Sequence, residues 1–195
     1  RLVATTEIDL RRDETGFRVF RDGEDVTDRL RTPEVSRATP VVAQHFEVSR
    51  YVFQTARKIG EAHDIVIEGR NAGTDIFPEP RAIKFYLTAS IEERGNRRLR
   101  DYKKTHPEMT LPDVIRELEA RDRQDSEREI APLRKAADAV QLDNSKLTAA
   151  ETADEMQKII QAKLAEQKAR AEARGVTERV PAKVVLTGET SGQEI

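Results

Sequence analysis

The sequence predicts an α/β protein with a parallel sheet, because short apolar runs alternate with helical segments along its 195 residues. Two of the runs, DIVIE at 64–68 and IKFYL at 83–87, are nearly continuous and rich in strand-forming residues. Such runs are typical of strands buried in a parallel sheet. Capping boxes at 90–93 and 148–151, each a Ser or Thr with Glu three residues on, predict the starts of two helices.

The first sixty residues predict a small hairpin followed by helices. Residues 2–10 and 16–21 indicate two short strands joined by a tight turn. The Thr-Pro pair at 32–33 supplies an N-cap hydroxyl and a proline at the first helical position, so a helical segment is expected to start there. Pro40 interrupts it, and the spacing of apolar residues predicts a second helix that ends at about Gly60.

Downstream of the strand at 83–87, three helices and one further strand are expected. The first capping box opens a helix that runs to about residue 104, and a charged helix over 111–128 has few apolar residues, so it can only be half buried. Residues 139–142 predict a last short strand. The second capping box opens a helix whose apolar face extends to about residue 164, and 176–195 is expected to be a mobile tail.

The composition excludes several classes of function. Lys and Arg total 34 against 36 Asp and Glu, and this net charge of -2 argues against binding a polyanion by bulk charge. The chain has no cysteine, which excludes disulfides, thiolate zinc and cysteine nucleophiles, and its three histidines match no metal-ligand spacing. No run approaches a membrane span and no secretion signal is seen, so the cytoplasm fits best. Because the chain begins with Arg1, it is expected to be a fragment or a processed product.

The most informative constellation lies in the charged helix. At about 100° per residue, positions 121, 125 and 128 fall within about 60° of one another on one helix face. They place two guanidinium groups, Arg121 and Arg128, around the carboxylate of Asp125. Such a row can clamp a phosphate and accept a hydrogen bond from a sugar hydroxyl. The alternative is a surface ladder of ion pairs between neighbouring helical turns.

Two further sets of residues are candidates for ligand binding. Arg70 and Asn71 directly follow the strand at 64–68, and ligands of open α/β sheets bind outside the carboxyl ends of the strands. The alternative there is an ordinary glycine-containing turn. The helix after residue 90 carries a run of cations that can close over phosphates or form a solvated face. Its basic residues are Arg94, Arg97, Arg98, Arg100, Lys103 and Lys104.

The ordered set of these motifs resembles the bacterial cytidylate (CMP) kinases over roughly residues 15 to 160. Each piece is weak by itself, but together and in this order they are specific. The pieces are GEDVT at 23–27, LRTPEV at 30–35, EGRNAGT at 68–74, IFP at 76–78, LTAS at 87–90, EER at 92–94 with RR at 97–98, Arg121-Asp122 through Asp125 and Arg128, APL at 131–133, ADA at 137–139 and LDNS at 142–145.

The resemblance implies a P-loop nucleoside monophosphate kinase fold, with a parallel sheet core and helices on both faces. It also implies a small β-containing monophosphate-binding insertion over 1–60, a core over 61–175 and a helical lid over 94–128. The implied reaction, in pyrimidine metabolism, transfers the γ-phosphoryl group of ATP to CMP or dCMP with Mg²⁺. The implied partners are these nucleotides, with no nucleic acid and no membrane, and the implied state is a monomer.

By the same resemblance, individual residues receive roles. Arg70 and Arg128 are expected to bind the monophosphate, and Arg121 and Asp125 to contact the phosphate and the pentose, so that Arg121 and Arg128 act at the reacting groups. Asn71 is expected to contact the base. The lid cations are expected to be Arg94, Arg97 and Arg98.

The sequence also departs from the family's pattern. The family's Gly-Lys-Ser/Thr loop should precede residue 1, and none of the nine glycines is followed by Lys, so ATP and Mg²⁺ are expected to be bound mainly by an absent N-terminal segment. The family's first strand is central, so its absence is expected to leave a gap in the core. Pro40, Ser49 and Asn71 replace the family's Ser, Arg and Asp. Because an Asn amide can also donate to a uracil carbonyl, base discrimination is expected to weaken.

Two other functions remain as hypotheses from the sequence. The first is a pseudoenzyme or regulatory domain that keeps the kinase fold without phosphorylating anything. The second is a nucleic-acid-binding module that uses residues 94–104, which the net charge of -2 disfavours.

Overall fold

The computed structural model describes residues 5–14, 16–30, 35, 38, 41–103, 106–175 and 182–188, without the side chain of Arg12. The chain divides into two compact units at the boundary between Ile59 and Gly60. The helix α3 (Phe46–Ala62) carries the chain across this boundary. Its end confirms the helix predicted to finish at about Gly60. The helix start predicted at 32–33 and the interruption at Pro40 lie outside the described residues.

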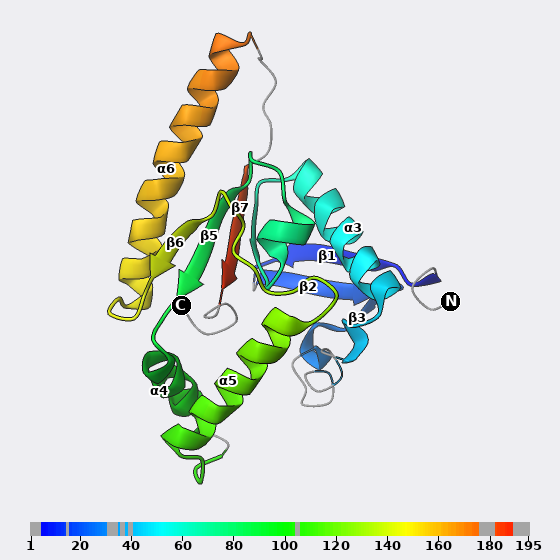
Figure 1. The fold of residues 1–195 in the computed structure, drawn as a ribbon. Coiled ribbons are helices and arrows are strands. Elements are labelled where there is room, and N and C mark those ends of the chain that lie inside the picture. The colour runs from blue at the N-terminus through cyan, green and yellow to red at the C-terminus, as the bar shows by residue number, and fades with distance from the viewer. Residues whose placement is uncertain are drawn as a thin grey trace. The chain divides into compact units, whose positions relative to one another are not determined.

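The first unit contains a three-stranded antiparallel sheet, in the order β1-β2-β3 (Figure 1). β1 (Ile8–Asp13) pairs with β2 (Gly16–Arg21), and β3 (Glu24–Asp25) adds two residues at the edge of β2 before a short 3₁₀ turn (Thr27–Arg29). The predicted hairpin is therefore confirmed. Its first strand is β1 from Ile8, and residues 2–4 of the predicted range lie outside the described residues.

Asp25 anchors the end of this sheet, and the pKa of its carboxyl group is lowered to about 2, from an ordinary value of 3.8. The main causes are hydrogen bonds from the Thr27 backbone N–H and hydroxyl, followed by one from Arg18. Because the folded-state pKa is depressed, Asp25 stabilises the fold fully above about pH 4 and loses this contribution as the pH falls toward 2.

We expect a carboxyl titration of the chain by NMR to place Asp25 at about 2. In a Thr27→Val variant, which removes the hydroxyl donor but keeps the backbone one, the pKa of Asp25 should rise toward 3.8. An Asp25 that titrates at its ordinary value in the unchanged chain would contradict this assignment.

The second unit is built on a four-stranded parallel sheet with the order β4-β7-β5-β6 (Figure 1). β4 (Ile65–Glu68), β5 (Ile83–Thr88) and β6 (Val140–Asp143) confirm the three strands predicted for this part of the chain. The remaining strand is β7 (Lys183–Gly188).

The helices of this unit follow the predicted boundaries closely. α4 (Ile91–Tyr102) and α6 (Ala149–Ala173) begin where the capping boxes predicted, and in both the cap hydroxyl accepts a hydrogen bond from the N–H of the Glu three residues on. α5 (Leu111–Glu127) packs on α4. Their close approach requires Gly95, because a Cβ there would lie 2.9 Å from Leu111 Cδ1.

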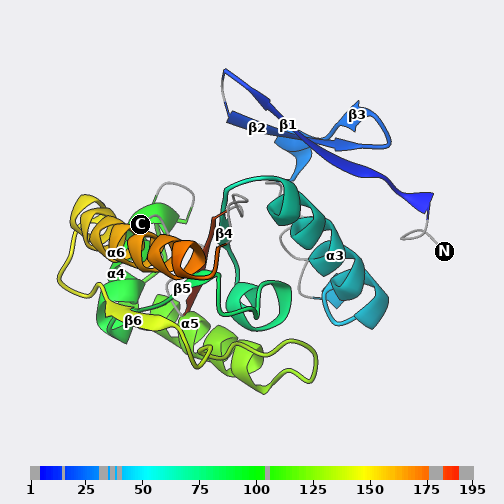
Figure 2. The same ribbon diagram turned by 90° about the horizontal axis from the view of Figure 1, so that it is seen from above.

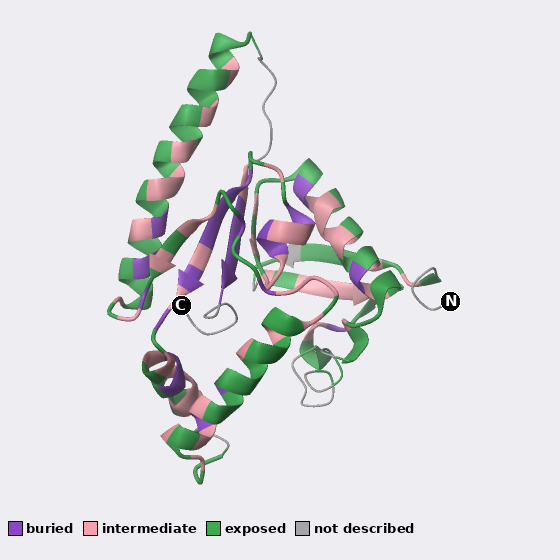
Figure 3. Cartoon of the chain, viewed as in Figure 1, coloured by how far each residue is buried: buried purple, intermediate pink, exposed green. Residues whose placement is uncertain are grey.

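The core lies between the sheet and α6 (Figures 1 and 2). Every second residue of β5 and β7 faces α6, as expected because successive side chains of a strand point to opposite faces of the sheet. The helical turn at Ala72–Ile76 contacts β7. Among the strands, β5 and β7 are the most completely buried (Figure 3). The cluster facing α6 consists of Ile83, Phe85, Leu87, Met156, Val184 and Leu186, with Val140, Leu142, Ile159 and Ile160 packed against it.

The expectation of a mobile tail over 176–195 was wrong for residues 183–188. These residues form β7, which lies between β4 and β5 in the sheet. The run VVLT is short, apolar and β-branched, and it fills the position where a gap in the core was expected. The glycine at 188 suggested a loop, but it is the last residue of the strand. Residues 176–181 and 189–195 lie outside the described residues.

Candidate functional site

Arginine and aspartate side chains from three elements meet beyond the carboxyl end of β4. Arg70 follows β4 directly, and its Nε lies 3.2 Å from Asp125 Oδ2 on α5. Arg70 Nη1 is 3.9 Å from Asp122 Oδ1, one helical turn before Asp125. Arg94 of α4 donates from Nη1 to Asp122 Oδ2 at 2.6 Å. Residues that are far apart in the sequence thus form one polar cluster.

The predicted row on α5 belongs to the same cluster. Asp125 lies 3.8 Å from Arg121 and 3.7 Å from Arg128, measured between the nearest charged atoms. Arg128 is not on the helix, because α5 ends at Glu127 and Arg128 has extended backbone angles. Its Nε donates to the carbonyl of Ala131 at 2.7 Å, and this bond turns the guanidinium back toward Asp125.

Burial gives this cluster its electrostatic character. The side chains of Arg70 and Asp125 are only 14% and 16% exposed, whereas Arg121 is 54% exposed at the rim. Burial lowers the pKa of Arg70, and the nearby carboxylate of Asp125 opposes this effect. The guanidinium nevertheless stays charged at neutral pH, since arginine is effectively always protonated in proteins.

The cluster carries a surplus of positive charge and contains buried carboxylate oxygens. Four guanidinium groups, those of residues 70, 94, 121 and 128, face the two carboxylates of Asp122 and Asp125. One oxygen of each carboxylate, Asp122 Oδ1 and Asp125 Oδ2, is buried without a hydrogen-bond donor among the described residues. The arrangement can therefore hold a dianion and accept hydrogen bonds from a neutral donor.

Asn71 lies beside Arg70 and organises the turn that follows. Its backbone carbonyl accepts hydrogen bonds from the N–H groups of Thr74 and Asp75, at 3.3 and 2.9 Å. Its side chain makes no capping hydrogen bond to this turn. The backbone contacts therefore fix the position of Asn71 beside Arg70.

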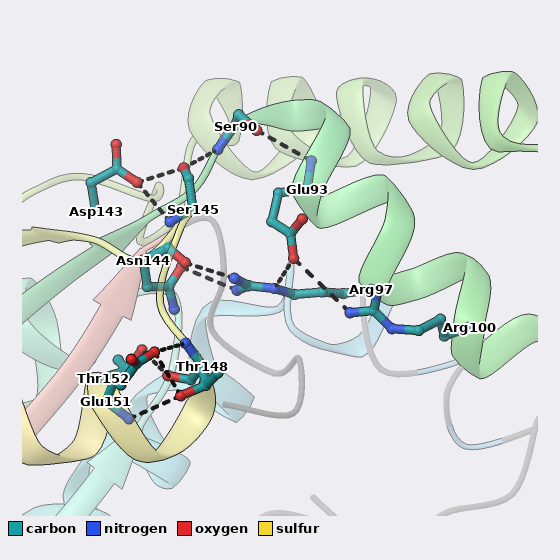
Figure 4. A network of polar contacts seen from close by, with 10 residues as sticks. All are labelled: Ser90, Glu93, Arg97, Arg100, Asp143, Asn144, Ser145, Thr148, Glu151 and Thr152. Carbon is teal, nitrogen blue, oxygen red and sulfur yellow. Dashed lines mark hydrogen bonds and ion pairs between the residues drawn. The ribbon is translucent and has the colours of Figure 1, made fainter.

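The three expected lid cations occupy different environments. Arg94 is buried in the cluster below Arg70. Arg97 donates from Nε to Glu93 and from its two terminal nitrogens to the side chain and the carbonyl of Asn144, at 2.9, 3.1 and 2.7 Å (Figure 4). Arg98 stacks over the ring of Tyr102. Arg98 therefore contacts its own helix, whereas Arg94 links α4 to α5 and Arg97 links α4 to the loop after β6.

That loop borders a cavity of about 500 Å³ at the carboxyl end of β6. Ser145 donates to Asp143 and accepts a hydrogen bond from the N–H of Ser90, so the loop is fixed to the start of α4 (Figure 4). The hydrogen bonds from the hydroxyl and N–H of Ser145 lower the pKa of Asp143. The residues that line the cavity are Glu93, Arg97, Arg100, Asp101, Asn144, Ser145, Lys146, Leu147, Thr148, Ala149 and Thr152.

Sequence reasoning did not identify this cavity or the role of Asp122. The cavity had a usable signal, since residues 143–145 follow a predicted strand as Arg70 does, and ligands bind at this edge of the sheet. Asp122 had no such signal, because its partner Arg94 lies 28 positions earlier on another helix.

The described residues do not form a protein-only metal site. Within them, no group of three or more His, Asp or Glu side chains is close enough to hold a metal ion. We therefore assign no metal ligand. Among the same residues, no helix is both long and apolar enough to span a bilayer.

Comparison with known proteins agrees with this architecture. The family model of cytidylate kinases matches residues 1–162. The cytidylate kinase of Bacillus subtilis (strain 168) is 38% identical over 162 residues, which cover 83% of this chain and 72% of that protein. The cytidylate kinase of Geobacter sulfurreducens is 40% identical over 159 residues, covering 82% of this chain and 68% of that protein.

The parallel sheet, its helices and these matches define a nucleoside monophosphate kinase, a phosphotransferase with the α/β fold of that class. Within this class, the chain belongs to the cytidylate kinase family.

Proposed function

We propose that the cluster around Arg70 binds CMP or dCMP and presents its phosphate to ATP for phosphoryl transfer. The observation that carries this proposal is the balance of four guanidinium groups against two carboxylates in a largely buried site. This surplus matches the charge of about −1.5 to −2 on a phosphate monoester at pH 7. The names of the relatives support the cytidine nucleotide as the substrate.

The geometry supports a division of roles within the cluster. Arg70 and Arg128 flank Asp125 and can donate to phosphate oxygens, while the more exposed Arg121 reaches the same phosphate from the rim. The other oxygen of this carboxylate, Asp125 Oδ1, lies 3.7 Å from Arg128 Nη1 and can accept a hydrogen bond from a pentose hydroxyl. Asp122 holds Arg94, which adds positive charge beneath the site.

We propose that the donor nucleotide occupies the cavity at β6. Arg100 and Lys146 line it and offer cations for a polyphosphate, whereas Arg97 is already bound to Asn144 and shapes the wall. Mg²⁺, which cytidylate kinases are expected to use, would arrive with ATP and neutralise phosphate charge.

Catalysis at such a site needs positioning and charge neutralisation rather than a general base. Phosphoryl transfer passes through a loose transition state with charge spread over the transferred oxygens, and fixed cations lower its energy. The buried, ion-paired Arg70 is held in place before the substrate arrives, so little reorganisation is required. We propose that the enzyme acts as a monomer in the cytoplasm.

Base selection is proposed to depend on Asn71, whose amide makes no capping hydrogen bond. An Asn can accept from the cytosine amino group or donate to a uracil carbonyl, so both bases are tolerated. We expect Asn71→Asp to raise the ratio of kcat/KM for CMP over UMP roughly tenfold or more, because a carboxylate only accepts. The matched control is Asn96→Asp on α4, which should leave the ratio unchanged. An unchanged ratio in Asn71→Asp would show that this residue does not select the base.

The test of the function itself is ADP formation by the product of the complete coding sequence, with ATP, Mg²⁺ and each of CMP, dCMP and UMP. The proposal predicts turnover that depends on a cytidine monophosphate. CMP binding without turnover would instead indicate a pseudoenzyme that retains the acceptor site.

A further inference from the structure

We infer that Asn144 is a specificity-determining residue: Arg97 orients its side-chain amide so that the NH₂ group donates a hydrogen bond to the base of the donor nucleotide. Asn144 follows β6, borders the cavity at the end of that strand and is only 1% exposed. The presence of a donor nucleotide in this cavity rests on the proposed function, whereas the orientation of the amide rests on the structure alone.

The backbone of Asn144 is fixed by three hydrogen bonds. Its N–H donates to the carbonyl of Thr88 at the end of β5, at 2.9 Å. Its carbonyl accepts from the N–H of Leu147 at 3.2 Å and from Arg97 Nη2 at 2.7 Å. These contacts use only main-chain atoms of residue 144, so a change of its side chain leaves the loop anchored.

Arg97 determines which way the side-chain amide of Asn144 faces. Arg97 Nη1 donates to Asn144 Oδ1 at 3.1 Å, and Arg97 Nε is held by Glu93 Oε1 at 2.9 Å. Because a guanidinium group only donates, the amide oxygen and not the nitrogen must face it. Figure 4 shows the nitrogen pointing away from Arg97. The chemistry of the partner therefore fixes the NH₂ group as the part of the amide that is left for a ligand.

The NH₂ group of Asn144 lacks an acceptor within the part of the chain that the structure describes. There, the side-chain hydrogen bond of Asn144 uses Oδ1 alone. The polar groups of the cavity at the start of α6 are paired with one another: Thr152 donates its hydroxyl to the carbonyl of Thr148, and Thr148 donates to Glu151. Because an amide donor kept from water is costly to leave unpaired, an acceptor on a ligand would bind here favourably.

The charges beside Asn144 favour a base over a phosphate as this ligand group. Arg97 is 14% exposed, and its charge is balanced by Glu93, its ion-pair partner in the same helix. The cavity wall also includes the apolar side chain of Leu147, which suits contact with a planar ring. Arg100 is 68% exposed and therefore stays available for the polyphosphate at the rim. A neutral, planar group with a hydrogen-bond acceptor fits the position next to Asn144.

The test compares the affinities of ATP, GTP, CTP and UTP for the product of the complete coding sequence, by calorimetric titration without CMP. We expect the unmodified protein to prefer ATP. Asn144→Asp should lower the preference for ATP over at least one of the other three by about tenfold or more, because a carboxylate still accepts from Arg97 but cannot donate to the base. All four ligands carry the same triphosphate, so repulsion by the new charge cancels in each ratio.

The matched control is Asn96→Asp, which adds the same charge at an exposed position of α4 outside the cavity lining. It should leave all three ratios unchanged. If Asn144→Asp does not fold, Asn144→Ala replaces it, because the backbone contacts of residue 144 do not need the side chain. The same preference for ATP must then fall.

The outcomes separate this inference from the proposed function. Ratios that stay unchanged in the variant of Asn144 would overturn the inference alone, as would equal affinities of the unmodified protein for the four nucleotides. Unchanged ratios together with weaker binding of inorganic tripolyphosphate would place a phosphate oxygen, rather than the base, at Asn144. An unmodified protein that binds CMP but none of the triphosphates would refute both the inference and the proposed place of the donor nucleotide.

Discussion

Replacing Arg70 by alanine should weaken CMP binding by about 2 to 5 kcal/mol, the usual effect of truncating one partner of a buried, hydrogen-bonded charge pair. The side chain is 14% exposed and lies 3.2 Å from Asp125, so its loss removes a phosphate donor and leaves a buried carboxylate without its nearest cation. Arg70→Lys keeps the charge but not the planar fork, and an intermediate loss is expected. The measurement is calorimetric titration with CMP.

The matched control is Arg116→Ala on α5. Arg116 is 70% exposed and pairs only with the neighbouring Asp113 among the ion pairs of the described residues. Its removal should leave CMP affinity unchanged and cost little stability, as expected for a surface pair. Equal affinities for CMP in Arg70→Ala and in the unchanged protein would show that Arg70 does not bind CMP.

Replacing Asp138 by alanine should lower the free energy of unfolding by about 3 to 5 kcal/mol, because it leaves a buried ammonium group without its counter-ion. The Lys84 side chain is 1% exposed, and its Nζ donates to both oxygens of Asp138 at 2.9 Å and to the carbonyl of Pro78 at 2.8 Å. Urea unfolding measures this loss directly, provided that the slope of the unfolding free energy against urea concentration is the same in both proteins.

Two variants test whether this cost comes from the stranded charge. Lys84→Met removes the buried cation and leaves Asp138, which is 40% exposed and remains accessible to water, so the loss should be smaller than in Asp138→Ala. Glu155→Ala breaks the exposed pair with Lys158 and should cost about 0 to 1 kcal/mol. An Asp138→Ala protein as stable as the Glu155→Ala one would contradict the assignment.

Local pattern was sufficient to predict most of the second unit. The runs at 64–68 and 83–87 both form strands, but only β5 is buried on both faces as a nearly continuous apolar run suggests, whereas β4 alternates half-buried and exposed residues and Val66 is 72% exposed. The two Ser/Thr-to-Glu patterns marked the helix starts to the residue, since the cap hydroxyl satisfies a free backbone donor in both helices. The Glu completes the box only at α6, because Glu93 of α4 binds Arg97 and the Ser90 N–H donates to Ser145. Placement of Arg70 after a strand also indicated a ligand site.

Features that depend on distant partners could not be predicted in this way. The run of basic residues in α4 does not indicate that Arg94 is buried and paired with Asp122, whereas Arg98 lies over the ring of Tyr102. Periodicity defines which residues share a face but not which element covers it. For the same reason the pattern over 176–195 predicts a tail, whereas residues 183–188 form a strand between β4 and β5.

The most direct test of the central claim is titration of the protein with CMP alone, followed by the same titration of the Arg70→Ala and Arg116→Ala variants. CMP binding requires the acceptor site but not phosphoryl transfer, so the result does not depend on ATP. The account predicts saturable binding that is lost in Arg70→Ala and retained in Arg116→Ala. Binding of equal strength in all three proteins would show that the cluster around Arg70 is not the acceptor site.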